Sequence, residues 1–314
     1  MTADNPNDFP YQPAPPLDGS ARQRAAHWAV ASGLQAVDGL APSEYTSGLM
    51  TGYVSGAHEL PAIRKLVEDR YRSAASLGPA SSDDLAAQQE ADFVSLRITE
   101  LLARNAFLFD PGMLDDIHAY LFQDMDEDAF RPGAHKTDAL QKQEPILNGD
   151  SVLYADPSIV DRALKFAFDE ERAFAYAPAF DAAQLEHLAR FAARIWQVHP
   201  FAEGNTRTTA VFLILYLRHL GFDAENEPFE RHSCYFRDAL VRANYRNARA
   251  AAMPDLQPLV RFFDNLLNDA HHELRSDDLR VQALFDDSAL LRNVPPEEAL
   301  NQPQPAKIKQ RATP

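Results

Sequence analysis

Within nine residues, from His199 to Arg207, the sequence places an imidazole, a carboxylate, a Gly-Asn pair and a guanidinium. The His199 ring can accept a proton near neutral pH, and the Glu203 carboxylate offers the oxygen ligands that Mg²⁺ prefers. Gly204 and Asn205 tolerate unusual backbone angles, so successive N–H groups can point into one concavity. A base, a metal-binding carboxylate and an anion-binding turn are the groups that phosphate transfer needs.

The segment before this stretch predicts a helix that ends at His199. Apolar residues precede it at steps of three and four and share one face: Leu185, Leu188, Ala192 and Ile195. On spacing alone, the simpler interpretation of His199 is a core histidine that hydrogen-bonds a carbonyl group. Pro200 disfavours helical geometry in the residue before it, so we expect the imidazole at the helix C-terminus, beside the loop.

The segment after it predicts a second helix, from Thr206 to Leu217, whose first N–H groups lack helical partners and form a seat for phosphate. Arg207 in the first turn opposes the helix dipole, which indicates a nearby anion. Phe201, apolar in a polar loop, is expected to anchor that loop in the core. For Glu203 taken alone, a solvated carboxylate is the simpler interpretation.

The rest of the chain indicates a mostly helical protein. Capping residues and apolar spacing predict helices at about 20–35, from 43, and at 59–75, 82–104, 111–121, 157–174, 234–246 and 255–275. The exception is 146–154, where Asn148-Gly149 separates two short apolar stretches, which predicts a small β-hairpin flap.

Composition excludes several classes of function. The 314 residues carry a formal net charge of -16, which argues against binding to nucleic acid or to an anionic membrane. Cys234 is the single cysteine, so we expect neither an internal disulfide nor a cysteine zinc site, which fits the cytoplasm. The first 19 residues lack the basic and apolar regions of a signal peptide, and the longest apolar run, 210–217, is too short for a membrane span.

The stretch His199-Pro200-Phe201-Ala202-Glu203-Gly204-Asn205-Thr206-Arg207 resembles the signature of Fic-domain proteins, H-x-F-x-(D/E)-G-N-x-R. Residues 117–124, 146–154 and 237–245 resemble the helix upstream, the flap and the helix downstream of that signature. The resemblance implies an all-α, Fic-type helical bundle with a small β-hairpin flap over the active site. The expected parts are a disordered tail (1–19), a helical N-terminal extension (20–109), the Fic catalytic core (110–268), a C-terminal helical extension (269–292) and a second disordered tail (293–314).

The resemblance also implies an enzyme: a protein adenylyltransferase that moves AMP from Mg-ATP to a Ser, Thr or Tyr hydroxyl of a target protein. In this role His199 is the general base and Glu203 holds Mg²⁺. The nucleotide phosphates would be bound by four residues: Gly204, Asn205, Thr206 and Arg207. The target would dock along the flap, at Leu147, Asn148, Gly149, Asp150 and Ser151.

Two departures from the family pattern leave the transferred group open. Thr206 stands where many Fic proteins have a second glycine, and Ala210 where they have a second arginine. A Doc-like protein kinase, another NMP transferase and a catalytically silent Fic-fold binding or toxin partner are therefore alternatives. The family's inhibitory motif has one weak counterpart, Ser55-x-x-x-Glu59, which we interpret as chance. A small antitoxin is a further candidate partner.

Overall fold

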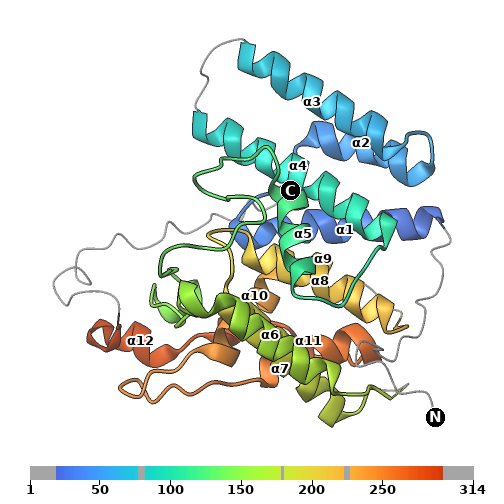
Figure 1. The fold of residues 1–314 in the computed structure, drawn as a ribbon. Helices are drawn as coiled ribbons and strands as arrows, with labels where there is room; N and C mark the ends of the chain where they lie inside the picture. Colours follow the sequence, from blue (N-terminus) through green and yellow to red (C-terminus); the bar gives the residue numbers. More distant parts are fainter. Residues whose placement is uncertain (1–18, 77–81, 178–179, 223–226, 293–314) are drawn as a thin grey trace, which may run out of the picture.

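The computed structural model describes residues 19–76, 82–177, 180–222 and 227–292, and within them every regular element is a helix (Figure 1). The α-helices are α1 (Ala21–Gly33), α2 (Glu44–Ser55), α3 (Leu60–Ser76), α4 (Ser82–Arg104), α5 (Gly112–Phe122), α6 (Val160–Arg172), α7 (Ala182–Val198), α8 (Asn205–His219), α9 (Glu227–Arg231), α10 (Ser233–Asn244), α11 (Gln257–Asn268) and α12 (Gln282–Asp286). Short 3-10 turns complete the fold: η1 (Leu34–Asp38), η2 (Pro145–Leu147), η3 (Pro157–Ile159), η4 (Ser276–Leu279) and η5 (Ser288–Leu290). The expected helical fold class is confirmed.

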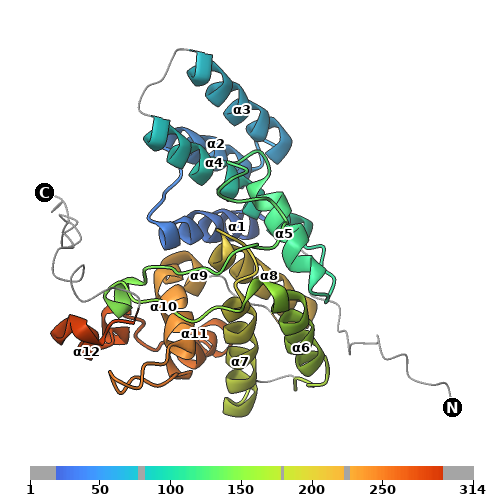
Figure 2. The same cartoon turned by 60° about the vertical axis from the view of Figure 1, so that its left-hand side comes forward.

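Helix α8 forms the centre of the molecule. Its residues from Asn205 to Arg218 are all buried, and α4, α5, α7 and η1 pack around it. Figures 1 and 2 place α6, α7, α10 and α11 toward one end of the molecule and α2 and α3 at the other, with α1 between them. The helix that follows the motif is therefore held on one side by the N-terminal helices and on the other by the remaining bundle.

The N-terminal helices have a smaller core of their own. It joins α2, α3 and α4 and consists of Met50, Tyr53, Ile63, Val67, Tyr71, Phe93 and Leu96. Helix α1 packs on α4 and on α9, so it links this unit to the main bundle. As a consequence, the turn η1 at the end of α1 lies against α8 and α10, close to the motif.

The predicted β-hairpin at 146–154 is wrong, since no strand is present in the described part of the chain. Asn148 and Gly149 do adopt positive φ angles, 52° and 86°, as a tight Asn-Gly turn requires. The flanks do not pair as strands, because Pro145 starts the 3-10 turn η2 and the Ile146 and Val152 side chains are buried in the core. The C-terminal segment instead takes up the backbone of this loop, with the Val281 N–H donating to the Ile146 carbonyl at 3.0 Å.

The C-terminal part of the described chain is less helical than predicted. The helix predicted to reach residue 275 ends at Asn268, because Asp269 takes a left-handed conformation with φ 52°. Between Ser276 and Leu290 the chain forms only short turns and the five-residue helix α12. The two predicted tails lie outside the described residues, apart from Gly19.

Candidate active site

A cavity of about 210 Å³ opens where α7 ends and α8 begins. Its walls also include η1, the segment 142–145 and α10. The motif contributes His199, Glu203, Gly204, Asn205 and Thr206. Lys142 and Arg237 add two cations, whereas Asp38 and Glu144 add two further carboxylates. The structure therefore brings the predicted base, the predicted metal ligand and the turn into one space.

His199 is the C-cap residue of α7 and is only 5% exposed. Burial lowers its pKa well below the ordinary value, and the positive charges of Lys136 and Lys142 lower it further. This effect outweighs the helix dipole, which favours a protonated ring at this position. The ring is neutral at physiological pH. It lines the cavity, and the Tyr154 ring stacks on it with centroids 4.0 Å apart.

One ring nitrogen of His199 already has a partner. Nδ1 lies 3.3 Å from the Trp196 carbonyl oxygen, which favours the tautomer with the proton on Nδ1. Nε2 is then the nitrogen that can accept a proton. The Tyr154 hydroxyl donates to Glu144 at 2.9 Å, which fixes the ring that covers the imidazole. The arrangement is that of an oriented neutral base.

The loop after His199 is held from below by aromatic stacking. The Phe201 ring is buried and lies parallel to the His118 ring, with centroids 3.8 Å apart. His118 donates from Nε2 to the Glu203 carbonyl at 3.1 Å and accepts at Nδ1 from the Gly133 N–H at 2.9 Å. Burial lowers the pKa of His118 to about 4, so this ring is a neutral structural link. In the sequence, the only indication of this role is the place of His118 on the apolar face of α5.

The Glu203 side chain stands at the cavity wall and is 49% exposed. Its Oε1 contacts the ammonium group of Lys142. A half-exposed carboxylate beside a phosphate seat fits a Mg²⁺ ion, which needs only one or two protein carboxylates when nucleotide phosphates supply the rest. Among the described residues, no group of three His, Cys, Asp or Glu side chains converges as a separate metal site.

The turn between the loop and α8 depends on the residue types at positions 204 and 205. Gly204 has φ 75°, and a Cβ there would lie 2.3 Å from the Phe122 ring, so only glycine fits. The Asn205 side chain binds the loop backbone: it accepts from the Phe201 N–H at 3.0 Å and donates to the Phe201 carbonyl at 2.7 Å. The α8 N-terminus has no side-chain cap, so its first N–H groups remain available at the cavity.

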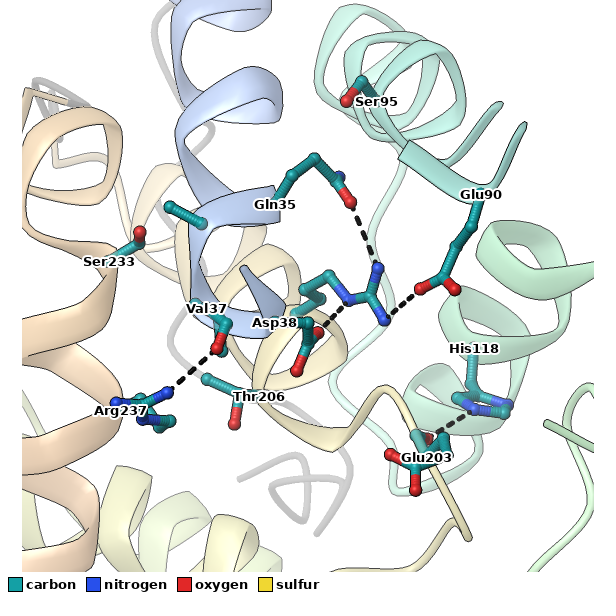
Figure 3. Close-up of polar contacts among 12 residues, drawn as sticks. Gln35, Val37, Asp38, Glu90, Ser95, His118, Glu203, Thr206, Ser233 and Arg237 are labelled. Carbon is teal, nitrogen blue, oxygen red and sulfur yellow. Dashed lines mark hydrogen bonds and ion pairs between the residues drawn. The ribbon is translucent and has the colours of Figure 1, made fainter. Parts of the chain in front are cut away.

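Thr206 and Arg207 differ in what they can offer the cavity. The Thr206 hydroxyl accepts from the Trp196 indole N–H at 2.9 Å, while the residue lines the cavity. Arg207 is 2% exposed, and three side chains bind its guanidinium: Gln35, Asp38 and Glu90, which are labelled in Figure 3. Its Nε lies 2.9 Å from Asp38, Nη2 lies 2.7 Å from Glu90, and Nη1 donates to Gln35 at 3.1 Å.

Arg207 thus has an anion nearby, as its place in the first turn indicates, but the anions are two carboxylates of the chain itself. Its guanidinium also lies over the Phe122 ring, 4.9 Å from the centroid. Ala210, one turn further along α8, is fully buried. The Arg207 side chain, which we expected to face phosphates, instead contacts residues of η1 and α4.

Sequence reasoning missed the groups that come from outside the motif: Gln35, Asp38, Glu90, Lys142 and Arg237. Asp38-Gly39 is an acidic-glycine pair in the sequence, but it lacks the glutamate of the family's inhibitory motif. Ser55 and Glu59, the weak counterpart of that motif, lie at the connection between α2 and α3, where the Ser55 hydroxyl donates to the Gly52 carbonyl. Arg237 donates to the Val37 carbonyl at 2.9 Å, so both arginines of the site contact η1 or its end (Figure 3).

The expected docking flap is also held by the chain itself. Leu147 is buried, and the Asn148 side chain donates to the Leu284 carbonyl at 2.9 Å. Asp150 is buried and accepts from the Tyr245 hydroxyl at 2.7 Å. Arg292 donates to the Ser151 carbonyl at 2.5 Å. The C-terminal segment therefore covers the edge at which we expected a target to dock.

Residues 108–217, which run from just before α5 almost to the end of α8, match the sequence model of the Fic/DOC family. This segment is a Fic/DOC-family domain. Fic-domain proteins are in general NMP transferases that act on protein targets, and some of them have antitoxins. Neither a curated protein nor a solved structure matches the chain. In the part of the chain that the structure describes, no helix has the length and apolarity that a membrane crossing requires.

Proposed function

We propose that this chain is a protein adenylyltransferase that transfers AMP from Mg-ATP to a Ser, Thr or Tyr hydroxyl of a target protein. The proposal is supported chiefly by the neutral, buried His199, which shares one cavity with the uncapped N-terminus of α8. A base and an anion seat in the same small space serve attack by a hydroxyl on a phosphate. The cytoplasm, where ATP is present, is the proposed compartment, and a small antitoxin is a candidate second partner.

His199 would act as the general base. The target hydroxyl would give its proton to Nε2 as its oxygen forms a bond to the α-phosphorus of ATP, and the bond to the β-phosphate oxygen would break. The products are the AMP-modified protein and pyrophosphate, with the proton held on His199. Because the buried ring disfavours its charged form, it would pass the proton on readily.

The negative charge would be held by the turn and by Lys142. The N–H groups at Gly204, Asn205 and Thr206 would bind the phosphates, and the α8 dipole favours an anion there. Glu203 would hold Mg²⁺, which neutralises phosphate charge when bound. Lys142 would then exchange its contact with Glu203 for a phosphate oxygen. Arg237 would supply a second cation from α10.

The cavity is smaller than the several hundred Å³ that small-molecule sites usually have, so one wall must move before a nucleotide fits. The turn η1 is the wall segment that contributes Val37 and Asp38. Its displacement would enlarge the cavity and also remove one carboxylate partner of Arg207. Arg207 would then be able to contact the nucleotide.

Labelled ATP tests this proposal. We expect His199-dependent transfer of label to protein from [α-³²P]ATP with Mg²⁺, and none from [γ-³²P]ATP, when the enzyme is incubated with a cell lysate. His199→Ala should reduce the transfer at least about a thousandfold, since general-base and nucleophile-orienting effects are both lost. His271→Ala, at an exposed histidine outside the cavity, is the matched control.

Other outcomes identify the alternatives. Label from the γ-phosphate alone would overturn AMP transfer in favour of a Doc-like protein kinase. Transfer only from another labelled NTP would indicate a different NMP transferase. No His199-dependent label from any nucleotide would leave a catalytically silent binding or toxin partner.

A further inference from the structure

The backbone at His199 is unusual for its sequence. The residue has φ 50° and ψ 62°, a left-handed conformation that helix C-caps normally give to glycine or asparagine. Pro200 adds a second constraint, because a residue before proline is driven toward extended backbone. Neither the residue type nor its neighbour favours the observed geometry. Contacts from elsewhere in the fold must therefore hold it.

Lys136 makes those contacts on both sides of His199. Its backbone N–H donates to the Pro200 carbonyl at 2.7 Å, and its side-chain Nζ donates to the Val198 carbonyl at 3.0 Å. The Lys136 side chain is buried. Val198 is the last residue of α7, and its carbonyl belongs to the set that a helix leaves without internal partners. One residue thus binds the carbonyl groups of the residues before and after the proposed base.

The same ammonium group also acts on the imidazole electrostatically. Lys136 Nζ lies 5.9 Å from the centroid of the Tyr154 ring, and that ring stacks on His199. Burial is the first reason that the His199 pKa is low, and the charge of Lys136 is the next. Burial also lowers the pKa of Lys136 itself, to about 8.

The loop that carries Lys136 is also anchored outside the motif. The preceding residue, His135, places Nε2 2.9 Å from Asp115 on α5 and Nδ1 3.0 Å from Asp161 on α6. Lys136 therefore reaches the end of α7 from a loop that is tied to two other helices. A contact of this kind can impose a backbone conformation, since it does not move with the segment that it holds.

We propose that Lys136 is a positioning residue that holds His199 in its left-handed conformation and keeps the ring oriented toward the cavity. The inference rests on the proposed role of His199 as the base, but it concerns a residue outside the family motif. Lys136 acts through the two carbonyl groups that flank His199 and touches no reacting atom.

Replacement of Lys136 tests this role. In K136M, which removes charge and donor together, we expect kcat for AMP transfer to fall about a hundredfold with KM for ATP nearly unchanged, because a displaced base slows chemistry more than binding. K136R, which keeps a charged donor, should recover most of the loss. Lys165→Met on α6, an exposed lysine paired with Asp169, is the matched control and should match the wild type.

An NMR titration of His199 separates this inference from the proposed function. With ¹³C-labelled histidine, K136M should raise the titration midpoint of His199, since a nearby positive charge is removed and water gains access. This readout remains valid even if no transfer activity is found. A K136M protein with wild-type kcat, or with an unchanged His199 titration, would overturn the proposal.

The wild-type protein provides a test in case the variants do not fold. The His199 resonance should show a second inflection near pH 8, where Lys136 loses its proton. Other titratable groups also lie near the His199 ring: Lys142, Glu144 and Glu203 line the same cavity, and Tyr154 stacks on the ring. The ¹⁵Nζ resonance of Lys136 is therefore followed in parallel, so that the inflection can be assigned to Lys136. The two inflections should coincide. A His199 resonance that stays flat while Lys136 titrates would contradict the proposal.

Discussion

The two ends of the motif differ in what surrounds them. At the His199 end, Lys136, Tyr154 and the Trp196 carbonyl orient the imidazole and leave the ring at the cavity wall. At the Arg207 end, Asp38 and Glu90 neutralise the guanidinium and turn it toward the N-terminal helices. The proposed base is thus oriented at the cavity, whereas the motif cation is bound by the protein's own carboxylates. On the proposed function, the fold restrains binding of the nucleotide donor and not activation of the acceptor hydroxyl.

Gly204→Ala should displace the turn that joins the His199 and Arg207 ends of the motif, and we expect it to have the largest effect. The new Cβ would meet the Phe122 ring, and the φ of 75° would become strained, at about 1–3 kcal/mol for the backbone alone. Displacement of the turn by about an ångström should lower AMP transfer by roughly a hundredfold. Thermal unfolding and labelled-ATP transfer measure the two effects. Gly48→Ala on α2, where a Cβ would meet nothing within 4 Å, is the control.

Asp38→Ala should move stability and donor binding in opposite directions. Arg207 would keep Glu90 but lose Asp38, whose side chain is 44% exposed, so we expect a loss of only about 1 kcal/mol in the free energy of unfolding. Affinity for Mg-ATP should rise by up to about tenfold, because η1 is less firmly held and Arg207 is less fully neutralised. Calorimetric titration with a non-hydrolysable ATP analogue measures the second effect.

Asp277→Ala is the matched control for that change, since it removes an exposed carboxylate paired with Arg280. It should alter neither the free energy of unfolding nor the affinity for the ATP analogue. If Asp38→Ala binds the analogue more weakly than the wild type, Asp38 supports the nucleotide site and does not restrain it, and the comparison between the two ends fails.

The sequence was sufficient to predict the parts of the site that are local. Pro200 placed His199 at the end of a helix, and Gly204 marked the turn, because both effects act between neighbouring residues. The helical fold class was also predictable, since the apolar spacing of most helices is regular. These features depend on short segments of chain and on the periodicity of the helix.

The parts that were not predictable depend on contacts between distant segments. Nothing near Arg207 indicates that Asp38 and Glu90 bind it, and nothing near Lys136 indicates that it holds the end of α7. The Asn148-Gly149 turn formed with the expected backbone angles, but the hairpin did not, because the C-terminal segment binds the carbonyls of Ile146 and Ser151. Local preference determined the turn, and tertiary contacts determined its flanks.

His135→Gln tests the loop that supports the His199 end of the motif, and we expect it to have the smallest effect. Hydrogen bonding to Asp115, followed by the charges of Asp115 and Asp161, raises the pKa of His135 above its ordinary value. A raised pKa in the folded state means that the stabilisation is complete below about pH 6.5, the unfolded value, and is lost as the pH rises through the folded one. The variant should therefore lose stability at pH 5.5, by less than about 1 kcal/mol because the pairs are partly exposed, and little at pH 9. Urea unfolding at both pH values, with His271→Gln as the control, measures this difference. A loss that is equal at pH 5.5 and pH 9 would show that the ring acts through packing and not through its charge.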